Sequence, residues 1–583
     1  MSTNLSKLRR DELLGKIEQI RAFLNQSLYD ENARRLAGYL NELAAEVKGK
    51  KYGLVFEEHR EKIDDTLAAS VPVLTEEADL FVDGGGEVHF LLEGDNLASL
   101  RLLEKTHKGK IDVIYIDPPY NTGNKDFIYD DDFVDSTDSF RHSKWLSFME
   151  KRLQIARDLL SEKGVIFISI DDNEQSDLKL LCDEIFGENN FIGLMTLMSN
   201  PRGSQNSKNL SYIHEYVLVY SKNALTLELQ GVSKSEESLN EFKESDDNGR
   251  RYRLLGLRKR GGDWKKEDRP NMFYPIYVNP KTGECNLNKS NIFSEEVIPQ
   301  RPTGELSRWT WGKEKFENEK SLIVGKIVNE GRENQGWDIF RKDYIDNSDG
   351  VEKQTKLKSI WIEKETNYQN AKNEMKDIFG NSEIFNFPKP TYIVSRLTSI
   401  FPNKSATVLD FFAGSGTTGH AVLKLNAEDG GHRRFILCTN NENGICRNIT
   451  YERLRTVITG KRRDGSAYSD GLPGSLKYFR VDFVPVGEKE YYEYADRLLL
   501  HVRELVELEN AVNFFGNARL AIVLTEEEAA LFFAQVASAD TSTVKTLYLG
   551  HDVLLSKAQK AALKRHGIGV KIIPQYYYPE LNG

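Results

Sequence analysis

Long apolar runs are the first feature that this sequence lacks. Only 39% of its 583 residues are hydrophobic, and no uninterrupted apolar stretch approaches the ~18 residues that span a bilayer. The N-terminal segment MSTNLSKLRRDELLGKIEQ also lacks the apolar core and the small-residue cleavage site of a secretory signal. We therefore expect a cytoplasmic protein with no part embedded in a membrane.

Cysteine is scarce, and an ATP-binding motif is missing. The spacings of Cys182, Cys285, Cys438 and Cys446 match neither a CxxC metal-ligand pair nor a disulfide framework, so we expect four reduced thiols and no metal site. No Gly-Lys pair is followed by Ser or Thr, so the chain carries no Gly-x-x-x-x-Gly-Lys-Ser/Thr loop of its own.

An overall positive charge is absent too, since the formal net charge is -10. This argues against a uniformly basic nucleic-acid binder, because phosphate contacts need Lys and Arg. Locally the balance reverses: residues 250–269 hold nine Lys or Arg against three acids, and a second basic stretch runs from Arg447 to Arg463. Either stretch is equally compatible with a binding groove and with an ordinary solvated surface.

The apolar pattern that is present predicts an α/β protein. Residues 8–47 have the spacing of two amphipathic helices, which suit a packing face or a subunit interface. From Val88 onward, short apolar runs such as IDVIYI (111–116) and GVIFISI (164–170) alternate with helical stretches, which favours a mostly parallel sheet. The same alternation returns at SATVLDFF (405–412) and RFILCTN (434–440).

Residues 200–385 break this regularity and contain five of the six tryptophans, which indicates an inserted domain. We expect a Rossmann-like fold with five regions: an N-terminal helical region (1–75), a first half of the sheet domain (76–199), the insertion (200–385), a second half (386–480) and a small C-terminal α/β domain (481–583).

The strongest chemical signal is the tetrapeptide Asp117-Pro118-Pro119-Tyr120, placed directly after the strand IDVIYI. In an open parallel sheet, ligands bind beyond the carboxyl ends of the strands. An aromatic amino group is a poor nucleophile, and its nitrogen must be held while it becomes tetrahedral. The Asp117 carboxylate and the Pro118 carbonyl can each accept one N–H, and Tyr120 offers a ring on which an extruded base can stack. A simple strand-ending turn is the alternative interpretation.

The second signal is the segment VLDFFAGSGTT (408–418), a strand that leads into a glycine turn and a helix. Glycines allow close approach of a ligand, and a helix N-terminus offers N–H groups that suit a carboxylate. Gly414, Gly416 and Gly419 nominally fit the dinucleotide pattern. The strand after them ends in Cys438-Thr439-Asn440-Asn441-Glu442, where only Glu442 can accept ribose hydroxyls, so we favour another nucleotide-like cofactor over NAD.

Together these motifs resemble the amino-methyltransferases of DNA, and their order, with the catalytic motif before the cofactor motif, is similar to the beta group. More closely, the chain resembles the Mod subunit of Type III restriction-modification systems over nearly its whole length. The segments that carry this resemblance are LLEGDNLASLRLL (91–103), IDVIYIDPPYNTGNKDFIYDDDF (111–133), GVIFISIDDNE (164–174), HEYVLVYSKN (214–223), FPKP (387–390), LDFFAGSGTTGHAVL (409–423) and CTNNENGICRNITYERL (438–454).

The resemblance implies a methyltransferase that uses S-adenosylmethionine to methylate adenine N6 in duplex DNA. It assigns the target adenine to Asp117, Pro118, Pro119 and Tyr120, and makes residues 200–385 the target recognition domain. The cofactor-binding residues that we expect are Asp95, Lys389, Asp410, Phe412, Ala413, Gly414, Ser415, Gly416, Thr417 and Glu442. The candidate DNA contacts are Arg251, Arg258, Lys259, Arg260, Lys265 and Lys266. The resemblance also predicts a homodimer and a separate Res subunit for ATP-driven cleavage.

Alternative activities remain at this stage. Cytosine-C5 methylation is excluded, because it needs a cysteine nucleophile, usually in a Pro-Cys pair, and no such pair occurs. Cytosine-N4 methylation uses a similar amino-group acceptor, but relatives with that specificity tend to carry Ser where Asp117 stands. A catalytically silent DNA-recognition subunit is the third hypothesis, and the intact motifs argue against it. Methylation of RNA or protein fits the long insertion less well.

Overall fold

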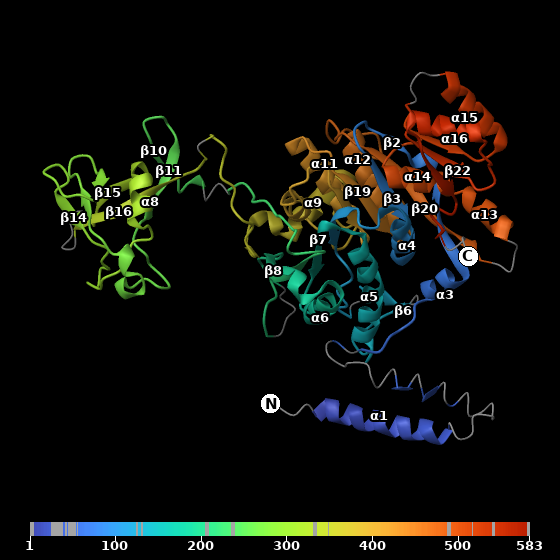
Figure 1. Cartoon of the computed structure of the whole chain (residues 1–583), viewed down its shortest axis with the longest axis horizontal. Helices are drawn as coiled ribbons and strands as arrows, with labels where there is room; N and C mark the ends of the chain where they lie inside the picture. Colours follow the sequence, from blue (N-terminus) through green and yellow to red (C-terminus); the bar gives the residue numbers. More distant parts are fainter. Residues whose placement is uncertain are drawn as a thin grey trace. The chain divides into compact units, whose positions relative to one another are not determined.

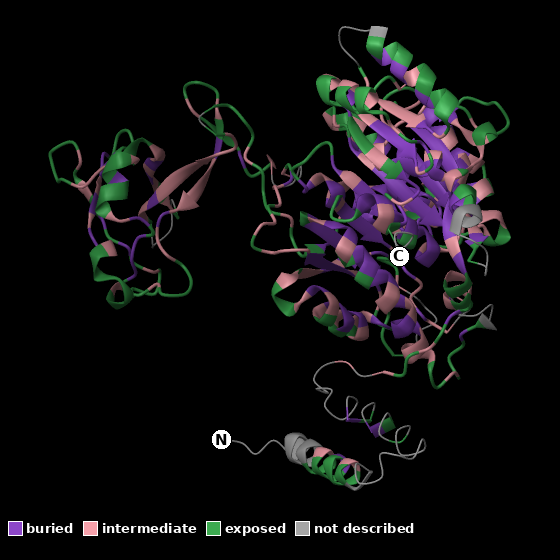
Figure 2. Ribbon diagram, turned by 45° about the vertical axis from the view of Figure 1, so that its right-hand side comes forward, coloured by how far each residue is buried: buried purple, intermediate pink, exposed green. Residues whose placement is uncertain are grey.

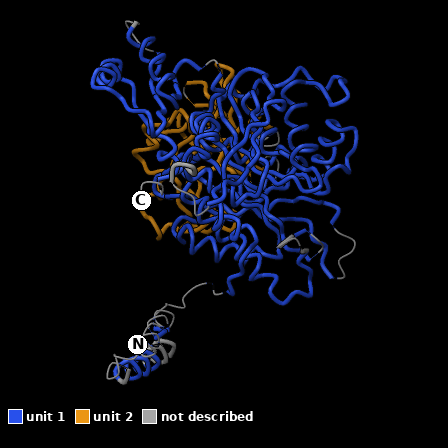
Figure 3. The backbone as a smooth tube through the Cα atoms, turned by 90° about the vertical axis from the view of Figure 1, so that its right-hand side faces the viewer, with its two compact units in different colours: residues 1–229, 358–583 blue, residues 230–357 orange. Residues whose placement is uncertain are grey.

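The computed structural model describes most of the chain. The described residues are 5–24, 36, 39–40, 43–44, 54, 56–123, 126–129, 132–203, 209–234, 239–329, 335–347, 349–486, 491–515, 517–538 and 543–579. They form two compact units, which are described separately below: residues 1–229 together with 358–583, and residues 230–357 (Figure 3).

The first unit begins with the helix α1 (Leu5–Leu24), which confirms the first of the two predicted amphipathic helices. Much of the second predicted helix lies outside the described residues. Ile17 of α1 packs with Leu40 and Ala44 in a small apolar cluster. None of the helices in the described part of the chain is both long and apolar enough to cross a membrane.

A large, mostly parallel sheet forms the centre of the first unit, which confirms the predicted α/β class. Its strands run parallel from β20 to β7, and antiparallel pairs occur toward the edges. The spatial order is β1 (Ser70–Glu76), β20 (Ser475–Pro485), β3 (Val88–Glu93), β19 (Arg434–Thr439), β18 (Thr407–Asp410), β4 (Ile111–Ile116), β7 (Leu160–Ile170), β9 (His214–Ser221), β8 (Phe191–Met198) and β17 (Ile360–Trp361), with β2 (Val82–Asp83) beside β20.

The strand order reverses between β18 and β4. Strands β3, β4 and β7 follow one another in the sequence, yet β19 and β18, which come after the insertion, lie between β3 and β4. This makes the β18–β4 junction the topological switch point, where open α/β sheets bind ligands at the carboxyl ends of the strands. The central strands are buried almost throughout, as expected for a sheet covered on both faces.

Helices cover both faces of this sheet, and the buried strands lie between them (Figure 2). On one face, α4 packs against α5, and α5 against α6. On the other, α11 packs against α10 and α12, and α12 also contacts α9 (Figure 1). The bounds are α3 (Lys62–Ala69), α4 (Asn96–His107), α5 (Arg141–Leu159), α6 (Gln175–Phe186), α9 (Tyr368–Phe379), α10 (Thr391–Ser399), α11 (Thr417–Asp429) and α12 (Glu452–Thr459). A short hairpin, β5 (Ile128–Tyr129) and β6 (Asp132–Phe133), follows β4 in the sequence.

The C-terminal part of the first unit has a small sheet and core of its own, as the predicted fold class requires. Three parallel strands alternate with helices, and Val523, Leu547 and Leu563 belong to their apolar core. The elements are α13 (Tyr491–Leu499), α14 (Val502–Asn510), β21 (Leu520–Val523), α15 (Glu526–Ser538), β22 (Thr546–Gly550), α16 (Lys557–His566) and β23 (Gly569–Ile573).

The second unit, residues 230–357, is built from antiparallel strands around buried Tyr274, Trp309 and Trp311. It lies within the predicted insertion, whose flanks 200–229 and 358–385 belong to the first unit. One sheet contains β10 (Glu244–Ser245), β11 (Arg251–Gly256), β16 (Gly336–Tyr344) and β15 (Ile323–Val328). The other contains β13 (Cys285–Asn286), β12 (Ile276–Val278) and β14 (Glu295–Val297), and the short helix α8 (Lys313–Asn318) also belongs to this unit.

Candidate active site

The two motifs singled out in the sequence leave the sheet side by side. The tetrapeptide 117–120 follows β4, the glycine turn 411–416 follows β18, and these strands are parallel neighbours, with Val408 opposite Val113 and Leu409 opposite Ile114. Both turns therefore emerge at the same edge of the sheet, at its switch point. The sequence separates these two strands by an insertion, and the sheet brings them together.

Hydrogen bonds hold the tetrapeptide in place. The indole Nε1 of Trp145 on α5 donates to the Pro119 carbonyl at 2.7 Å. The Tyr120 hydroxyl donates to Glu215 Oε2 at 3.1 Å. Two successive prolines fix their own φ angles, so these anchors leave the motif little freedom. Asn121, directly after it, has a φ of 55°, which turns the chain sharply at this point.

Lys389 joins the two motifs. Its ammonium lies 2.9 Å from Asp117 Oδ1 and donates to the Tyr120 hydroxyl at 2.7 Å. Its backbone carbonyl accepts a hydrogen bond from the Thr417 hydroxyl at 3.2 Å. We predicted Lys389 as a cofactor-binding residue; the structure brings its side chain to the tetrapeptide 117–120 and its main chain to the glycine turn.

Glu215 was not singled out in the sequence, although it lies in the quoted segment 214–223. It stands at the start of β9, is buried, and has its Oε2 3.6 Å from the Lys389 ammonium. Burial raises the pKa of Glu215 to about 7, although Lys389 opposes this shift. Burial lowers the pKa of Lys389, but Asp117 and Glu215 outweigh it and raise that pKa above its usual value. Burial and the same two carboxylates raise the pKa of Tyr120.

The glycine turn has the backbone that its sequence predicts. Gly414 and Gly416 have φ angles of 47° and 77°, in the left-handed region that favours glycine, and Gly416 is the N-cap of α11. Asp410 shapes the turn from within: its carboxylate accepts from the Phe412 N–H at 2.9 Å and from the Thr418 hydroxyl at 2.5 Å. Burial raises the pKa of Asp410 to about 7. Its side chain therefore supports the turn in this structure.

Arg453 braces the same turn and was missed by the sequence analysis. This fully buried guanidinium donates to the hydroxyls of Ser415 at 3.1 Å and Thr417 at 3.0 Å, and pairs with Glu374 at 3.0 Å. It belongs to the basic stretch 447–463, which we considered as a groove lining. Arg453 instead serves the interior of the fold. The composition of the stretch alone gave no signal of this burial.

The remaining predicted cofactor residues lie at neighbouring strand ends. Asp95 follows β3 and caps α4, because its Oδ1 accepts from the N–H groups of Leu97 at 2.7 Å and Ala98 at 3.2 Å. Glu442 follows β19 and is exposed. Strands β3, β19, β18 and β4 are consecutive and parallel, so these acids and both motifs emerge along one edge of the sheet.

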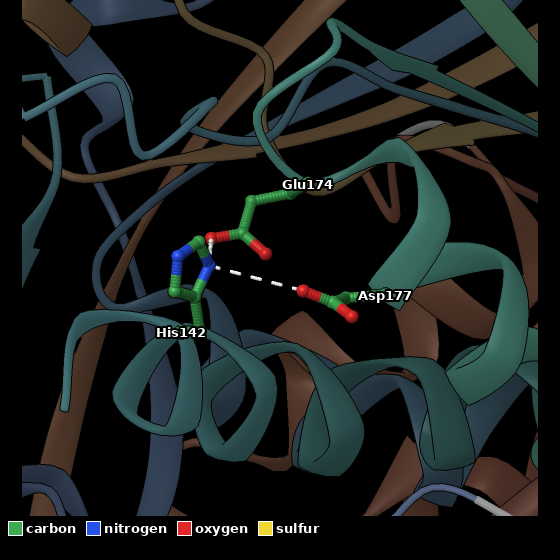
Figure 4. A group of neighbouring side chains, drawn as sticks. All are labelled: His142, Glu174 and Asp177. Carbon is green, nitrogen blue, oxygen red and sulfur yellow. Dashed lines mark hydrogen bonds and ion pairs between the residues drawn. The ribbon is translucent and has the colours of Figure 1, made fainter.

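A cluster of titratable groups supports the loop after the tetrapeptide. His142 Nδ1 lies 2.7 Å from Glu174 Oε1 and 3.8 Å from Asp177 Oδ2 (Figure 4). The same Glu174 oxygen accepts from the Asn121 side chain at 2.5 Å. Burial raises the pKa of Glu174 to about 8. These three residue types could hold a metal ion, but here the His142 nitrogen and the Glu174 oxygen are joined by a hydrogen bond.

All six candidate DNA contacts lie in the second unit. Arg251 stands on β11, and its guanidinium donates to the carbonyls of Phe242 and Leu239. The loop after β11 carries the other five, Arg258, Lys259, Arg260, Lys265 and Lys266. Buried Arg308 fixes this loop by pairing with Asp263 at 2.7 Å. The loop is therefore an ordered, basic part of this unit.

Comparison with known proteins assigns the chain to a class. Residues 111–451 match the family model described as DNA methylase, which is more than half of the chain, and the chain belongs to this family. It is a DNA methyltransferase, and the methyl donor of such enzymes is S-adenosyl-L-methionine.

Individual relatives show which DNA methyltransferases the chain is similar to. The chain is 37% identical over 400 residues to the Type II methyltransferase M.KpnI of Klebsiella pneumoniae, which covers 67% of this chain and 90% of that protein. It is 35% identical to the EcoPI Mod subunit of Escherichia phage P1 (61% and 58% covered) and 33% identical to the StyLTI Mod subunit of Salmonella typhimurium (67% and 60% covered). The similarity to Type III Mod subunits that we drew from motifs is thus confirmed, and it spans about three fifths of the length of these two proteins.

Proposed function

We propose that this chain methylates the exocyclic N6 of adenine within a specific sequence of duplex DNA, as the modification subunit of a Type III restriction-modification system. The observation that carries the proposal is the position of Asp117 and Pro118 at the end of β4, beside the glycine turn at the end of β18. An acceptor pair for an amino group and a cradle for a nucleotide-like cofactor meet there.

The residues at this edge of the sheet fit S-adenosylmethionine. A Cβ at Gly416 would come within 3.1 Å of Thr450, and one at Gly414 within 3.3 Å of Phe385, so close packing as well as the positive φ angles requires glycine at both positions of the turn. In the proposed site, Phe412 to Thr417 hold the methionine part, and Asp95 and Glu442 accept hydrogen bonds from the adenosine part. When bound, the cofactor supplies an electrophilic methyl group on a sulfonium.

The tetrapeptide would prepare the amino group for this methyl. The Asp117 carboxylate accepts one N–H of the flipped adenine and the Pro118 carbonyl accepts the other, which turns the nitrogen lone pair outward. The Tyr120 ring offers a face on which the base stacks, while its hydroxyl accepts a hydrogen bond from the Lys389 ammonium at 2.7 Å. Positioning is the main source of rate in this scheme.

Recognition of the target would be the task of the inserted segment. Its basic loop 258–266 and Arg251 are suited to phosphate and guanine contacts, and the aromatic ring of Trp264 stacks 3.7 Å beneath the Arg301 guanidinium. This arrangement presents cationic groups on a rigid support, which is what a reader of duplex DNA needs.

The Type III assignment rests on the Mod relatives and adds partners. A homodimer and a separate Res subunit, which supplies ATP-driven cleavage, belong to this proposal, as does a cytoplasmic location. A free-standing Type II methyltransferase is the second candidate, because M.KpnI is matched over 90% of its length and the two Mod subunits over 58% and 60%.

The test of the activity is a transfer assay with the full-length protein. Purified protein is incubated with radiolabelled S-adenosylmethionine and genomic DNA from a host that lacks adenine methylation, and nucleosides are then separated. We expect label in N6-methyladenosine, and methylation-sensitive sequencing then gives the target. Label in N4-methylcytosine, label only in RNA or protein, or cofactor binding without transfer would each refute the adenine assignment.

The test of the subunit role is separate. Size-exclusion chromatography with light scattering measures the oligomeric state, and affinity purification from the native host captures bound chains. A co-purified ATPase with DNA-dependent activity supports the Type III assignment, whereas an active protein without such a partner supports the Type II candidate.

A further inference from the structure

The proposed reaction creates a proton that the protein must accept. When the amino nitrogen attacks, its lone pair forms the new N–C bond, and the electron pair of the breaking S–C bond passes to sulfur. The nitrogen is then positively charged and must lose one hydrogen as a proton. A protonated amino group on a purine ring is a strong acid, but a site that excludes water needs a built acceptor.

A chain of one ion pair and two hydrogen bonds starts at the tetrapeptide. Asp117 Oδ1 lies 2.9 Å from the Lys389 ammonium, which donates to the Tyr120 hydroxyl at 2.7 Å, and that hydroxyl donates to Glu215 Oε2 at 3.1 Å. From Lys389 onward each donor faces the next acceptor, and Glu215 is the last. The first link is an ion pair in which the Lys389 ammonium is the donor, so Lys389 can take a proton from Asp117 only as it passes one of its own to Tyr120.

The chain lies in the interior of the first unit. The side chains of Lys389 and Glu215 are only 7% and 5% exposed, and that of Asp117 is 24% exposed. Glu215 Oε1 is buried and forms no hydrogen bond among the described residues. One end of the path is thus a partly exposed carboxylate, and its other end has an unused acceptor atom.

The charged and titratable groups that face this chain come from several elements. Tyr115 on β4, Asp410 on β18 and Tyr368 at the start of α9 surround Asp117, Lys389 and Glu215. Two carboxylates share one ammonium, because Lys389 pairs with both Asp117 and Glu215. A single buried pair would be neutral, so this cluster carries one extra negative charge that a proton can neutralise.

We propose that Glu215 is the final acceptor of the proton released in methyl transfer, and that Lys389 and Tyr120 relay it from Asp117. The proposal rests on the proposed function. Asp117 takes the proton from the methylated nitrogen. Asp117 then gives a proton to Lys389 as Lys389 gives one to the Tyr120 oxygen and Tyr120 gives its own to Glu215. Lys389 and Tyr120 end as they began, and Glu215 ends as a neutral acid.

The pKa directions agree with this route. Glu215 has a pKa of about 7 and is half ionised near neutral pH, so it can both accept and release a proton there. Lys389 and Tyr120 have raised pKa values, so neither loses a proton unless it receives another. A cluster that only stabilised the fold would not need the pKa of Glu215 to lie near neutral pH while the pKa values of Lys389 and Tyr120 are raised.

The test is a single-turnover measurement with the full chain. Wild type and Glu215→Gln are mixed in excess over genomic DNA that lacks adenine methylation, and the rate of label transfer is followed across about pH 6 to pH 8. Below its pKa, Glu215 is protonated and cannot accept, so the wild-type rate falls about tenfold per unit below about pH 7. Glu215→Gln keeps the shape of the side chain, transfers about 10²-fold more slowly at about pH 8, and loses this dependence.

Glu507→Gln is the matched control. Glu507 is also buried, and its carboxylate lies 2.6 Å from Lys477, away from the tetrapeptide. We expect the wild-type rate and pH profile for this variant. Calorimetric titration with S-adenosylmethionine should give the same affinity for all three proteins, which separates a relay defect from a damaged site.

Two results would overturn the relay, and they are distinguishable. Wild type that transfers to adenine, with Glu215→Gln at the same rate and with the same pH profile, refutes the relay alone. Wild type that transfers nothing to adenine refutes the proposed function and the relay with it. If Glu215→Gln does not fold, Tyr120→Phe breaks the same chain at the hydroxyl, and an unchanged pH profile in that variant equally refutes the relay.

Discussion

Replacing Asp117 by Asn should remove most of the activity and leave the protein folded. Asn has the same shape but no charge. Once its carbonyl oxygen faces the Lys389 ammonium, which now lies 2.9 Å from a carboxylate oxygen, its remaining group is an NH2 donor that cannot accept the N–H of the amino group. Loss of one preorganised hydrogen-bonding group at a transition state costs about 10² to 10³ in rate, or about 2.7 to 4 kcal/mol. The Lys389 ammonium keeps Glu215 as a counter-charge at 3.6 Å, so the fold should tolerate the change.

The assay for this variant has two parts. Single-turnover transfer of label to genomic DNA should fall by about 10² to 10³, whereas the affinity for S-adenosylmethionine, measured by calorimetry, should change less than about twofold. Asp112→Asn is the matched control: Asp112 stands near the start of the same strand and accepts from the Thr407 N–H at 3.1 Å. A rate for Asp117→Asn within about twofold of the control would refute the role of Asp117 as amino-group acceptor.

Three further changes test other parts of the site. Lys389→Met should lower the free energy of unfolding by about 3 to 5 kcal/mol, because Asp117 and Glu215 would face each other without a cation; urea denaturation measures it, and an unchanged midpoint contradicts the buried ion cluster. Gly416→Ala should weaken S-adenosylmethionine binding. It should also lower the free energy of unfolding by about 1 to 2 kcal/mol, because alanine is strained at the positive φ of this position. A wild-type affinity in calorimetry would show that the turn does not bind the cofactor. Alanine at all three positions 258–260 should reduce the slope of log affinity against log salt by about 3 in filter binding, with cofactor affinity retained; an unchanged slope removes these residues from the DNA contacts.

Local sequence signals predicted the strands and turns that form the proposed catalytic centre, because these elements depend on neighbouring residues. The strand IDVIYI, the turn after it and the glycine loop before α11 each carry their pattern within about a dozen positions. The edge at which the two motifs meet followed from a general rule about parallel sheets. The large sheet and its mostly parallel strands are therefore the part of the fold that the apolar pattern predicts best.

The contacts between distant segments were beyond such signals. Lys389 and Asp117 are far apart in the sequence. Nothing in the residues around Lys389 indicates that its ammonium forms an ion pair with Asp117. Glu215 is the single acid of β9 and follows His214 at the start of the strand, so the sequence is equally compatible with an exposed residue at the end of a strand. Arg453 sits among other basic residues whose burial depends on how α12 packs against α9 and α11. Such contacts depend on how distant segments pack together in the fold, and a single sequence does not reveal that packing.

The insertion shows a different limit. The irregular composition of residues 200–385 is visible in the sequence. The sequence does not show that β17 belongs to the large sheet, because this strand is only two residues long and its Trp361 is buried like the tryptophans of the second unit. The compact unit of residues 230–357 has a smaller span than the predicted recognition domain. Short antiparallel strands in irregular loops give weak periodicity, so the sequence pattern locates the insertion but not its individual strands.

The two ends of the unit of residues 230–357 are paired with each other, and this pairing has a practical consequence. Val232 and Thr355 exchange two backbone hydrogen bonds, of 2.8 and 2.9 Å, so the chain enters and leaves the unit at one place. A segment whose two ends meet can be replaced as a cassette, because its host needs only to keep one pair of junctions. Given the proposed role of this unit in target recognition, exchange of residues 232–355 between relatives is therefore a route to enzymes with new target sequences that keep one and the same methyl-transfer centre.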